Sequence, residues 1–344
     1  MSEAYIKGFI VKTVVLFVLV LTGLNVLEAQ QNKEQEQVTE VTKQYYEGKL
    51  EGAELFVTKE EFDEAKGQVI KLTLPADVKK EQIGICDSYM DRKLVFTIQK
   101  DLEDFLSQQD LSQKVAQLKK ITFFTQEDVT TITLRFQKVY GYYLYYDKGN
   151  LWVKITTPKN KYKKIVVVDP GHGGEDPGSA YNGIVEKEVN LQVVNKLYSY
   201  MMEEEHIKVY YTRQSDVTLS GQKRIQFANE VGADFYISIH CNYVDRPTPN
   251  GTEVLYSETS DESKQLAEIA LEEMTQALGL KKRGLVKGNG IYIIRNAKMP
   301  IVLLELGFIS NEKDAKVLTD SEKQKELASS IVTVIKKGYS EFGD

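Results

Sequence analysis

The sequence predicts an α/β domain with a mostly parallel sheet flanked by helices, preceded by a smaller β-rich domain with one helix. Two patterns indicate this division. After about residue 163, short apolar runs alternate with amphipathic helical segments. Before residue 158, most apolar runs alternate with polar residues at every second position, as in half-buried strands. We therefore expect domains over residues 46–158 and 163–342.

The composition is that of an ordinary globular protein. A chain of 344 residues with 42% hydrophobic residues is long enough for two domains with real cores. The net charge of −6 argues against a nucleic-acid partner. Only two cysteines, Cys86 and Cys241, are present, which excludes a disulfide-stapled scaffold and a cysteine-rich metal site. We expect no disulfide between them, because they lie in different predicted domains.

The N-terminal segment has the pattern of an export signal. Lys7 and Lys12 precede a mostly apolar run over residues 13–27, which a small residue and a polar stretch follow. Residues 1–29 are therefore predicted to be a signal peptide, or alternatively an uncleaved membrane anchor through residues 8–27. In both cases the rest of the chain is expected in the cell wall, the periplasm or on the extracellular face of the membrane.

The elements of the first domain are expected to be mainly strands. Residues 30–45, rich in Gln and Glu, predict a polar, disordered linker. The strand-like runs are residues 68–74, 93–99, 130–136 and 150–156. The sequence DKGN at 147–150 predicts the turn of a hairpin. Apolar residues at helical spacing predict one helix over Leu102–Leu118.

The second domain is expected to alternate strands and helices. The strand-like runs are residues 165–168, 207–213, 234–240, 252–257 and 300–308; the helical ones are 189–202, 222–232, 264–278 and a last helix ending near Tyr339. Such folds bind their ligands just beyond the carboxyl ends of the parallel strands.

Two of the three histidines lie at that edge of the predicted sheet. His172 follows the strand 165–168 in a loop with Gly171, Gly173 and Gly174, which allow sharp turns and close approach. His240 ends the buried run FYISIH. By contrast, His206 begins a strand at the opposite edge and is expected to be a surface residue.

Glu305 is a carboxylate inside the apolar run PIVLLELGF. A buried carboxylate is unfavourable unless it is paired, bound to metal or protonated. We expect it to point toward the same edge as the two histidines; the alternative is a residue that caps a neighbouring loop.

Two histidines and a carboxylate match the ligands that zinc prefers, with one position left open for catalysis. The residues that qualify as the third ligand are Glu175, Glu186, Glu188 and Glu305. Spacing alone does not separate Glu186 from Glu188.

Five ordered blocks of sequence resemble a known family. They are VVVDPGHGGEDPGS, GIVEKEVNL, TRQSDVTLSGQKRIQFAN, FYISIHCN and PIVLLELGFISN. Together, over about residues 163–342, they resemble the zinc-dependent N-acetylmuramoyl-L-alanine amidases of the Amidase_3 family. The resemblance implies zinc bound by His172, Glu186 and His240, with Glu305 as the catalytic carboxylate.

The implied reaction is metal-assisted hydrolysis of the amide between N-acetylmuramic acid and L-alanine of the peptidoglycan stem peptide. Glu305 is expected to act as general base and then as proton donor to the leaving amine. Asp169 is a candidate to orient a ligand histidine, or else a turn residue before Pro170. Arg295 is a candidate contact for a substrate carboxylate, or else part of a surface ion pair.

One residue departs from the family pattern. Cys241 stands where the family usually has a small residue, and we expect its side chain to point away from the metal because neighbours in a strand alternate sides. Some relatives carry a helical insertion that occludes the site. Here residues 241–304 are accounted for by a strand, a helix and a hairpin-like return, so an open cleft without an internal plug is expected.

The first domain resembles the AMIN-type modules that hold such amidases near the wall, although no sharp motif carries this likeness. Its aromatic residues predict either a sugar-stacking platform or the ordinary packing of half-buried strands; they are Tyr140, Tyr142, Tyr143, Tyr145, Tyr146 and Trp152. Two alternative functions stay open: a zinc peptidase that cuts within stem peptides, and a non-catalytic peptidoglycan-binding protein.

Overall fold

The computed structural model describes residues 56–342 except 113, 203 and 205. The predicted signal or anchor at 1–29 and the linker at 30–45 lie outside the described residues. Two compact units are present. Within the described residues, the first comprises 56–65, Val69–Gln137 and Tyr143–Lys154, and most of the second is one segment that starts at Ile155. No helix in the described part of the chain is long and apolar enough to cross a membrane.

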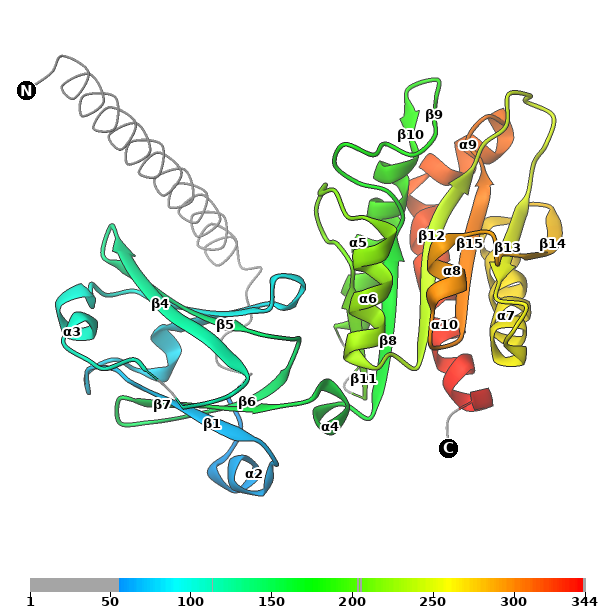
Figure 1. The fold of residues 1–344 in the computed structure, drawn as a ribbon. Coiled ribbons are helices and arrows are strands. Elements are labelled where there is room, and N and C mark those ends of the chain that lie inside the picture. Colours follow the sequence, from blue (N-terminus) through cyan, green and yellow to red (C-terminus); the bar gives the residue numbers. More distant parts are fainter. Residues whose placement is uncertain (1–55, 113, 203, 205, 343–344) are drawn as a thin grey trace, which may run out of the picture. The chain divides into compact units, whose positions relative to one another are not determined.

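The first unit consists of two sheets (Figure 1), and the four-stranded one is antiparallel throughout. One sheet has the order β1-β7-β6, formed by Gln68–Thr73, Asn150–Thr156 and Gly141–Asp147. The other has the order β2-β3-β5-β4, formed by Ile83–Ser88, Lys93–Ile98, Val129–Phe136 and Leu118–Gln126. The short helices are α2 (Lys59–Glu64), α3 (Glu103–Ser107), η2 (Lys80–Gln82) and η3 (Tyr89–Asp91). All four predicted strands are present.

The hairpin prediction at DKGN is confirmed. Strand β6 ends at Asp147 and β7 begins at Asn150. Between them Lys148 and Gly149 both have positive φ, 46° and 78°. Two successive positive φ values define the turn whose twist matches that of paired strands, and glycine at the second position makes it accessible.

The predicted helix over Leu102–Leu118 is wrong in length. Among the described residues of this range, the structure has only the single-turn helix α3, which buries Leu106. The Asp110 carboxylate accepts a hydrogen bond from the backbone N–H of Ser112 at 2.8 Å. This local turn competes with helical hydrogen bonding and ends the helix early. The apolar spacing beyond it therefore belongs to an irregular segment that leads into β4.

The second unit is built on a six-stranded sheet with the order β11-β8-β12-β15-β13-β14. The strands are β8 (Lys164–Pro170), β11 (Ile207–Tyr211), β12 (Phe235–Asn242), β13 (Thr252–Tyr256), β14 (Lys282–Lys287) and β15 (Ile301–Phe308). Only the β13–β15 pair is antiparallel. The expectation of a mostly parallel α/β sheet is confirmed.

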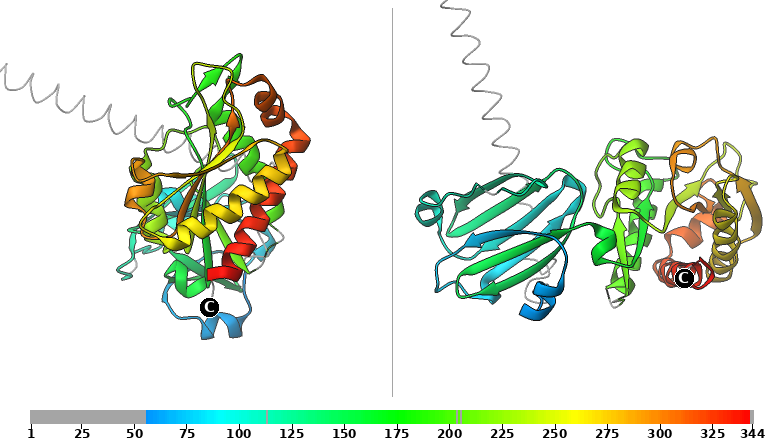
Figure 2. Two further views of the ribbon diagram at one scale, coloured as in Figure 1. Left: turned by 90° about the vertical axis from the view of Figure 1, so that its right-hand side faces the viewer. Right: turned by 60° about the horizontal axis from the view of Figure 1, so that its bottom comes forward.

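Helices cover both faces of this sheet (Figure 1). The helices described in this unit are α4 (Pro158–Lys161), which precedes the sheet, α5 (Glu186–Met201), α6 (Gly221–Val231), α7 (Asp261–Leu278), α8 (Tyr292–Asn296), α9 (Glu312–Thr319) and α10 (Ser321–Phe342). Helices α5, α7 and α10 pack on one face, and Figure 2 shows α7 and α10 side by side across it. Helices α6 and α8 contact each other on the other face.

The chain between His240 and Glu305 differs from the expected hairpin-like return. Strand β14 runs parallel to β13, and the short helix α8 follows it. The connection α7 crosses from β13 to β14, which is what a parallel pair requires. Helix α7 packs against α10 and the sheet.

Packing on both faces makes the central strands sensitive to side-chain loss. Leu304 in β15 has no exposed surface and belongs to the core shared with α5, α7 and α10. We expect Leu304→Ala to lower the free energy of unfolding by about 2–5 kcal/mol, because it leaves a cavity between packed layers. Urea denaturation followed by far-UV circular dichroism measures this. Val286→Ala, at an exposed position on the edge strand β14 (39% exposed), is the control and should change stability by less than about 0.5 kcal/mol.

Candidate metal centre

His172 stands in the loop that leaves the carboxyl end of β8. Its backbone has φ 62°, in the left-handed region that few residues other than glycine adopt. Such a conformation persists only where the surroundings enforce it. Gly173 and Gly174, with φ 130° and 61°, complete the turn. The loop thereby turns the imidazole of His172 back over the end of the sheet.

Two buried arginines hold this loop through its carbonyl groups. Arg224, on α6, donates to the carbonyls of His172 at 2.6 Å and Pro170 at 3.0 Å. Arg213, just after β11, donates to the carbonyls of Gly171 at 2.8 Å and Pro170 at 3.0 Å. These charge-assisted hydrogen bonds explain how a strained loop conformation is maintained.

Glu186 is the first residue of α5, and its buried side chain points back toward the loop. One carboxylate oxygen, Oε2, accepts a hydrogen bond from the backbone N–H of Ser179 at 2.8 Å. The backbone N–H of Glu186 donates in turn to the Ser179 carbonyl at 2.9 Å. A carboxylate at a helix N-terminus is also favoured by the helix dipole. Glu186 is therefore fixed by its own helix and by the loop that precedes it.

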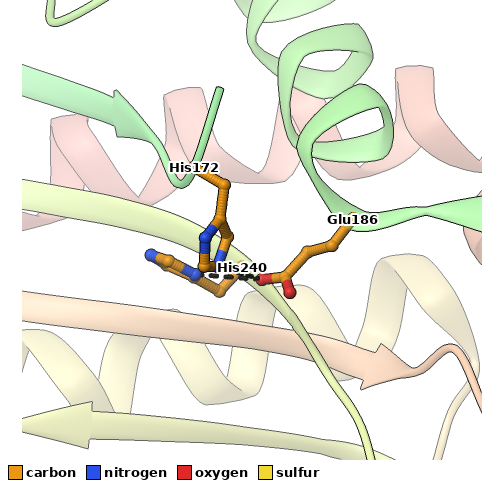
Figure 3. Close-up of side chains that lie close together, drawn as sticks. All are labelled: His172, Glu186 and His240. Carbon is orange, nitrogen blue, oxygen red and sulfur yellow. Dashed lines mark hydrogen bonds and ion pairs between the residues drawn. The ribbon is translucent and has the colours of Figure 1, made fainter. Parts of the chain in front are cut away.

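The second oxygen of Glu186, Oε1, brings the two histidines together (Figure 3). It lies 3.1 Å from His172 Nε2 and 3.0 Å from His240 Nδ1. One ligand atom from each of the three side chains lies within 4.8 Å of the others. The imidazoles keep 25% and 16% of their side-chain surface exposed, against 4% for Glu186, so the cluster is reachable from solvent.

Two glycines make room for the cluster. A Cβ atom on Gly171 would lie 2.1 Å from His240 Cε1. A Cβ atom on Gly178 would lie 2.6 Å from His172 Cδ2 and 2.7 Å from Glu186 Oε2. Any side chain at these positions would enter the space of a ligand residue, which explains glycine at both.

The electrostatics of the cluster are those of a carboxylate shared by imidazoles. Burial opposes charging of His172, but hydrogen bonds and charge from Glu186 and Asp176 outweigh it and raise the His172 pKa to about 9. Burial likewise opposes ionisation of Glu186, but hydrogen bonds from His172 and His240 hold its pKa well below the ordinary value. Without a metal the cluster therefore binds a proton, which a cation would have to displace.

Glu305 stands beside this cluster on β15. It is the register partner of His240 on β12, and its Oε2 is buried without a hydrogen-bond partner among the described residues. Burial, and then the negative charges of Glu186 and Glu253, raise the Glu305 pKa to about 8. An enclosed carboxyl group with no partner is typical of functional sites.

The structure shows which of the candidate glutamates lies with the two histidines. Glu186 is buried between the histidines, whereas Glu175 and Glu188 are not part of the cluster. Glu175 is exposed, and its backbone N–H donates to Thr218 Oγ1. The Cys241 side chain points away from the cluster, as expected. Its thiol lies 3.6 Å from Asn190 Oδ1, on the opposite side of the strand from His240. Cys241 and Cys86 are both free thiols.

Asp169 contacts other partners than those we predicted. Its buried carboxylate accepts hydrogen bonds from Ser238 Oγ at 2.8 Å, from Thr212 Oγ1 and from Arg224. The hydrogen bond to a ligand histidine comes instead from Asp176, whose Oδ2 lies 2.9 Å from His172 Nδ1. Asp169 thus acts on the site through Arg224, which holds the His172 loop.

Three residues that shape the site were not predicted from the sequence: Asp176, Arg213 and Arg224. Asp176 follows His172 by four residues in the same glycine-rich loop, a spacing that could have drawn notice to it. Arg213 lies two residues after the end of β11, at the same edge as the histidines. Arg295 lies exposed on α8, where its Nη1 is 3.5 Å from the Asn289 carbonyl. Its expected contact with a substrate carboxylate stays a prediction.

The residues present fit a zinc ion. Two imidazoles and one carboxylate are a donor set that zinc accepts with a fourth position left open. His172 presents Nε2 to the cluster while its other nitrogen is hydrogen bonded to Asp176, an arrangement usual for metal-bound imidazoles. Gly171 and Gly178 leave the space that the three ligand side chains occupy, which further supports a metal-binding site here.

Comparison with known proteins identifies relatives of the second unit. The family model described as N-acetylmuramoyl-L-alanine amidase (Amidase_3) matches residues 166–337, which is half of the 344-residue chain. The N-acetylmuramoyl-L-alanine amidase LytC of Bacillus subtilis is 36% identical over 190 residues, 53% of this chain but only 38% of LytC. The germination-specific N-acetylmuramoyl-L-alanine amidase of the same species is 31% identical over 195 residues, covering 53% of this chain and 82% of the relative.

A solved structure resembles this unit as well. The crystal structure of an N-acetylmuramoyl-L-alanine amidase from Clostridium difficile 630 aligns with a TM-score of 0.50 and 30% sequence identity. The alignment covers 53% of this chain and 98% of that structure.

The space around His240 yields a first prediction for this centre. We expect Gly171→Ala to weaken zinc binding at least about tenfold, because the added Cβ displaces the His240 ring. Competition with a fluorescent chelator measures the affinity. Gly290→Ala is the matched control, since a Cβ there meets no atom within 4 Å. Equal zinc affinity in the two variants would contradict the role of Gly171.

The raised pKa values predict how the metal-free protein responds to pH. The pKa of His172 rises from 6.5 to about 9, and the pKa of Glu305 rises from 4.5 to about 8. Both groups therefore bind protons more tightly in the folded chain than in the unfolded chain. That stabilisation is complete below the ordinary pKa values and is lost as pH rises through the folded ones. Between pH 6.5 and 9 we expect the chelator-treated protein to lose on the order of 4 kcal/mol of unfolding free energy, about half from each group.

Thermal unfolding at several pH values checks this expectation. Glu305→Gln removes one of the two groups, so its loss of stability over the same pH range should be smaller than that of the unmodified protein. A metal-free protein whose stability rises from pH 6.5 to 9 would contradict the assignment.

Proposed function

The chain belongs to the Amidase_3 family of N-acetylmuramoyl-L-alanine amidases, and from this premise we propose that it is a zinc-dependent amidase of peptidoglycan. The bond cleaved is the amide between N-acetylmuramic acid and the L-alanine that begins the stem peptide. One observation carries the proposal: the ligand atoms of His172, Glu186 and His240 lie within 4.8 Å of one another, beside Glu305, whose Oε2 has no hydrogen-bond partner among the described residues.

We propose His172, Glu186 and His240 as the zinc ligands. When bound there, zinc supplies Lewis acidity toward the scissile carbonyl and the attacking water. Asp176 holds the His172 ring in the orientation that presents Nε2. Arg224 and Arg213 keep the loop carbonyls, and hence the backbone of His172, in place. The ligand geometry therefore exists before substrate arrives, which reduces the reorganisation needed during the reaction.

Glu305 is the proposed general base. Its Oε2 has no competing hydrogen bond among the described residues, so it is available to take a proton from the attacking water and to pass it to the leaving amine of L-alanine. A pKa of about 8 keeps the carboxyl group protonated at neutral pH when no cation is near. A divalent cation in the cluster favours the ionised form, so the base becomes active together with the metal site.

We further propose that the protein acts outside the cytoplasm, where peptidoglycan lies. The export-like pattern of residues 1–29 supports this location, either as a cleaved signal or as an anchor. For residues 46–158 we propose a wall-targeting role. Tyr145 and Trp152 stack at 5.4 Å and both are only half-buried, as a sugar-binding surface requires. Tyr142 is buried and does not belong to such a surface.

The test of the proposed reaction is digestion of purified peptidoglycan with the zinc-loaded protein, followed by mass spectrometry. Free stem peptides that begin with an unmodified L-alanine, lost on chelation, are expected. Fragments cut within the stem would instead identify a peptidase, and an undigested wall that retains the protein would identify a binding protein.

Glu305→Gln separates catalysis from metal binding. We expect this variant to lose at least about a thousandfold in kcat, because general acid–base catalysis contributes factors of this size. Zinc affinity should stay within about threefold, since Glu305 is not one of the clustered ligands. A variant that retains more than a tenth of the activity would contradict the role of Glu305 as base.

A further inference from the structure

A row of charged side chains extends from the proposed metal site across the sheet. His240 on β12 pairs in register with Glu305 on β15, and Glu305 pairs with Glu253 on β13. Register partners on adjacent strands present their side chains on the same face, about 5 Å apart. Glu253 therefore lies next to Glu305 on the side away from the cluster.

Arg283 on β14 ends this row. Its Nε donates to Glu253 Oε2 at 2.6 Å, and its guanidinium carbon lies 4.8 Å from the centre of the Phe308 ring. The Nη1 atom lies 3.4 Å from the Asn250 carbonyl. The other oxygen of Glu253 accepts a hydrogen bond from Asn242 Nδ2 at 2.7 Å. The guanidinium is thus held in place from three directions.

This arrangement leaves part of the guanidinium available. The Arg283 side chain is 32% exposed, against 15% for Glu253, and its Nη2 has no hydrogen bond within the part of the chain that the structure describes. A guanidinium fixed in one orientation is well suited to bind a carboxylate, because its parallel N–H groups match the two oxygens. An ion pair at the surface contributes little to stability by itself.

We propose that Arg283 binds the α-carboxylate of the second stem-peptide residue, the γ-linked D-glutamate that follows L-alanine, and so selects stem peptides with a free acid at that position. The inference rests on the proposed amidase function. In an extended peptide that carboxylate lies about 7 Å beyond the scissile bond, since each residue spans about 3.5 Å. Two strand spacings of about 4.8 Å separate Glu305 from β14, and the Arg283 side chain reaches back toward Glu253. The lengths agree.

Two soluble substrates test this assignment directly. Muramyl-L-alanyl-γ-D-glutamyl-L-lysine carries the α-carboxylate, and muramyl-L-alanyl-γ-D-isoglutaminyl-L-lysine has a carboxamide in its place. For the unmodified zinc-loaded protein we expect a KM about tenfold lower for the acid. Arg283→Gln should raise KM for the acid about tenfold, with kcat unchanged and with less than a twofold effect on the amide. Arg283→Lys should recover part of the preference.

Matched controls distinguish this role from a structural one. Lys282→Gln removes the same charge from the neighbouring residue, whose Nζ pairs with Glu272 at 2.6 Å, and should leave both KM values unchanged. Equal losses on both substrates in Arg283→Gln, or no loss on either, would overturn the proposal. So would a selective loss in Arg295→Gln with none in Arg283→Gln.

A binding measurement keeps the inference independent of turnover. Calorimetric titration of the Glu305→Gln protein with the peptide L-alanyl-γ-D-glutamyl-L-lysine should show binding that weakens about tenfold when Arg283→Gln is added. If the unmodified protein cleaves neither muramyl tripeptide, the proposed amidase function is wrong, while this titration still decides whether Arg283 binds the carboxylate. Equal affinity with and without Arg283→Gln would reject it.

Discussion

The second unit depends on one buried carboxylate. Glu186 is almost wholly enclosed, and a lone charge in that position would be strongly unfavourable. It is stabilised by two imidazoles, by the N–H groups of Ser179 and Cys241, and by its place at the start of α5. Each of these contacts fixes a different part of the chain. The loop after β8, the end of β12 and the start of α5 are therefore held together by the same oxygen atoms.

A second set of buried charges supports the first. Asp169 lies under the loop, and its carboxylate accepts hydrogen bonds from Arg224, Ser238 and Thr212. Burial raises the pKa of Asp169, but the charge of Arg224 and hydrogen bonds outweigh this and leave the pKa lowered. Arg224 in turn reaches the carbonyl of His172. Ionised groups buried in this way need hydrogen-bond partners of opposite charge. Because these hydrogen bonds form in only one arrangement, they hold the strained loop in a single conformation.

Side chains alternate between the two faces along each strand, so the residues of the candidate site and the residues of the hydrophobic core occupy different positions of the same strands. Ile239 and Cys241 face the core beneath α5 and α10, while His240 between them points to the other face. The same alternation puts Leu304 and Leu306 in the core and Glu305 beside the cluster. Strand register then extends the functional face sideways to Glu253, and the side chain of Arg283, at a register shift in β14, reaches Glu253 by a hydrogen bond. The rigid sheet thus sets the spacing between a metal site and a charged group two strands away.

The sequence by itself determined the fold class, the hairpin at DKGN, and the placement of His172, His240 and Glu305 at one edge of a parallel sheet. These features depend on local periodicity, on turn residues and on the direction of parallel strands, which a single chain displays. Spacing alone did not determine which glutamate joins the histidines, because Glu186 and Glu188 differ only in where α5 begins and how it is rotated; the family resemblance was needed to favour Glu186. The sequence also did not show that Asp176, rather than Asp169, contacts His172, because that contact depends on how the glycine-rich loop turns. It did not reveal Arg283, whose contact with Glu253 joins segments 30 residues apart. Only tertiary packing, which fixes the rotation of helices and the register of strands, decided them.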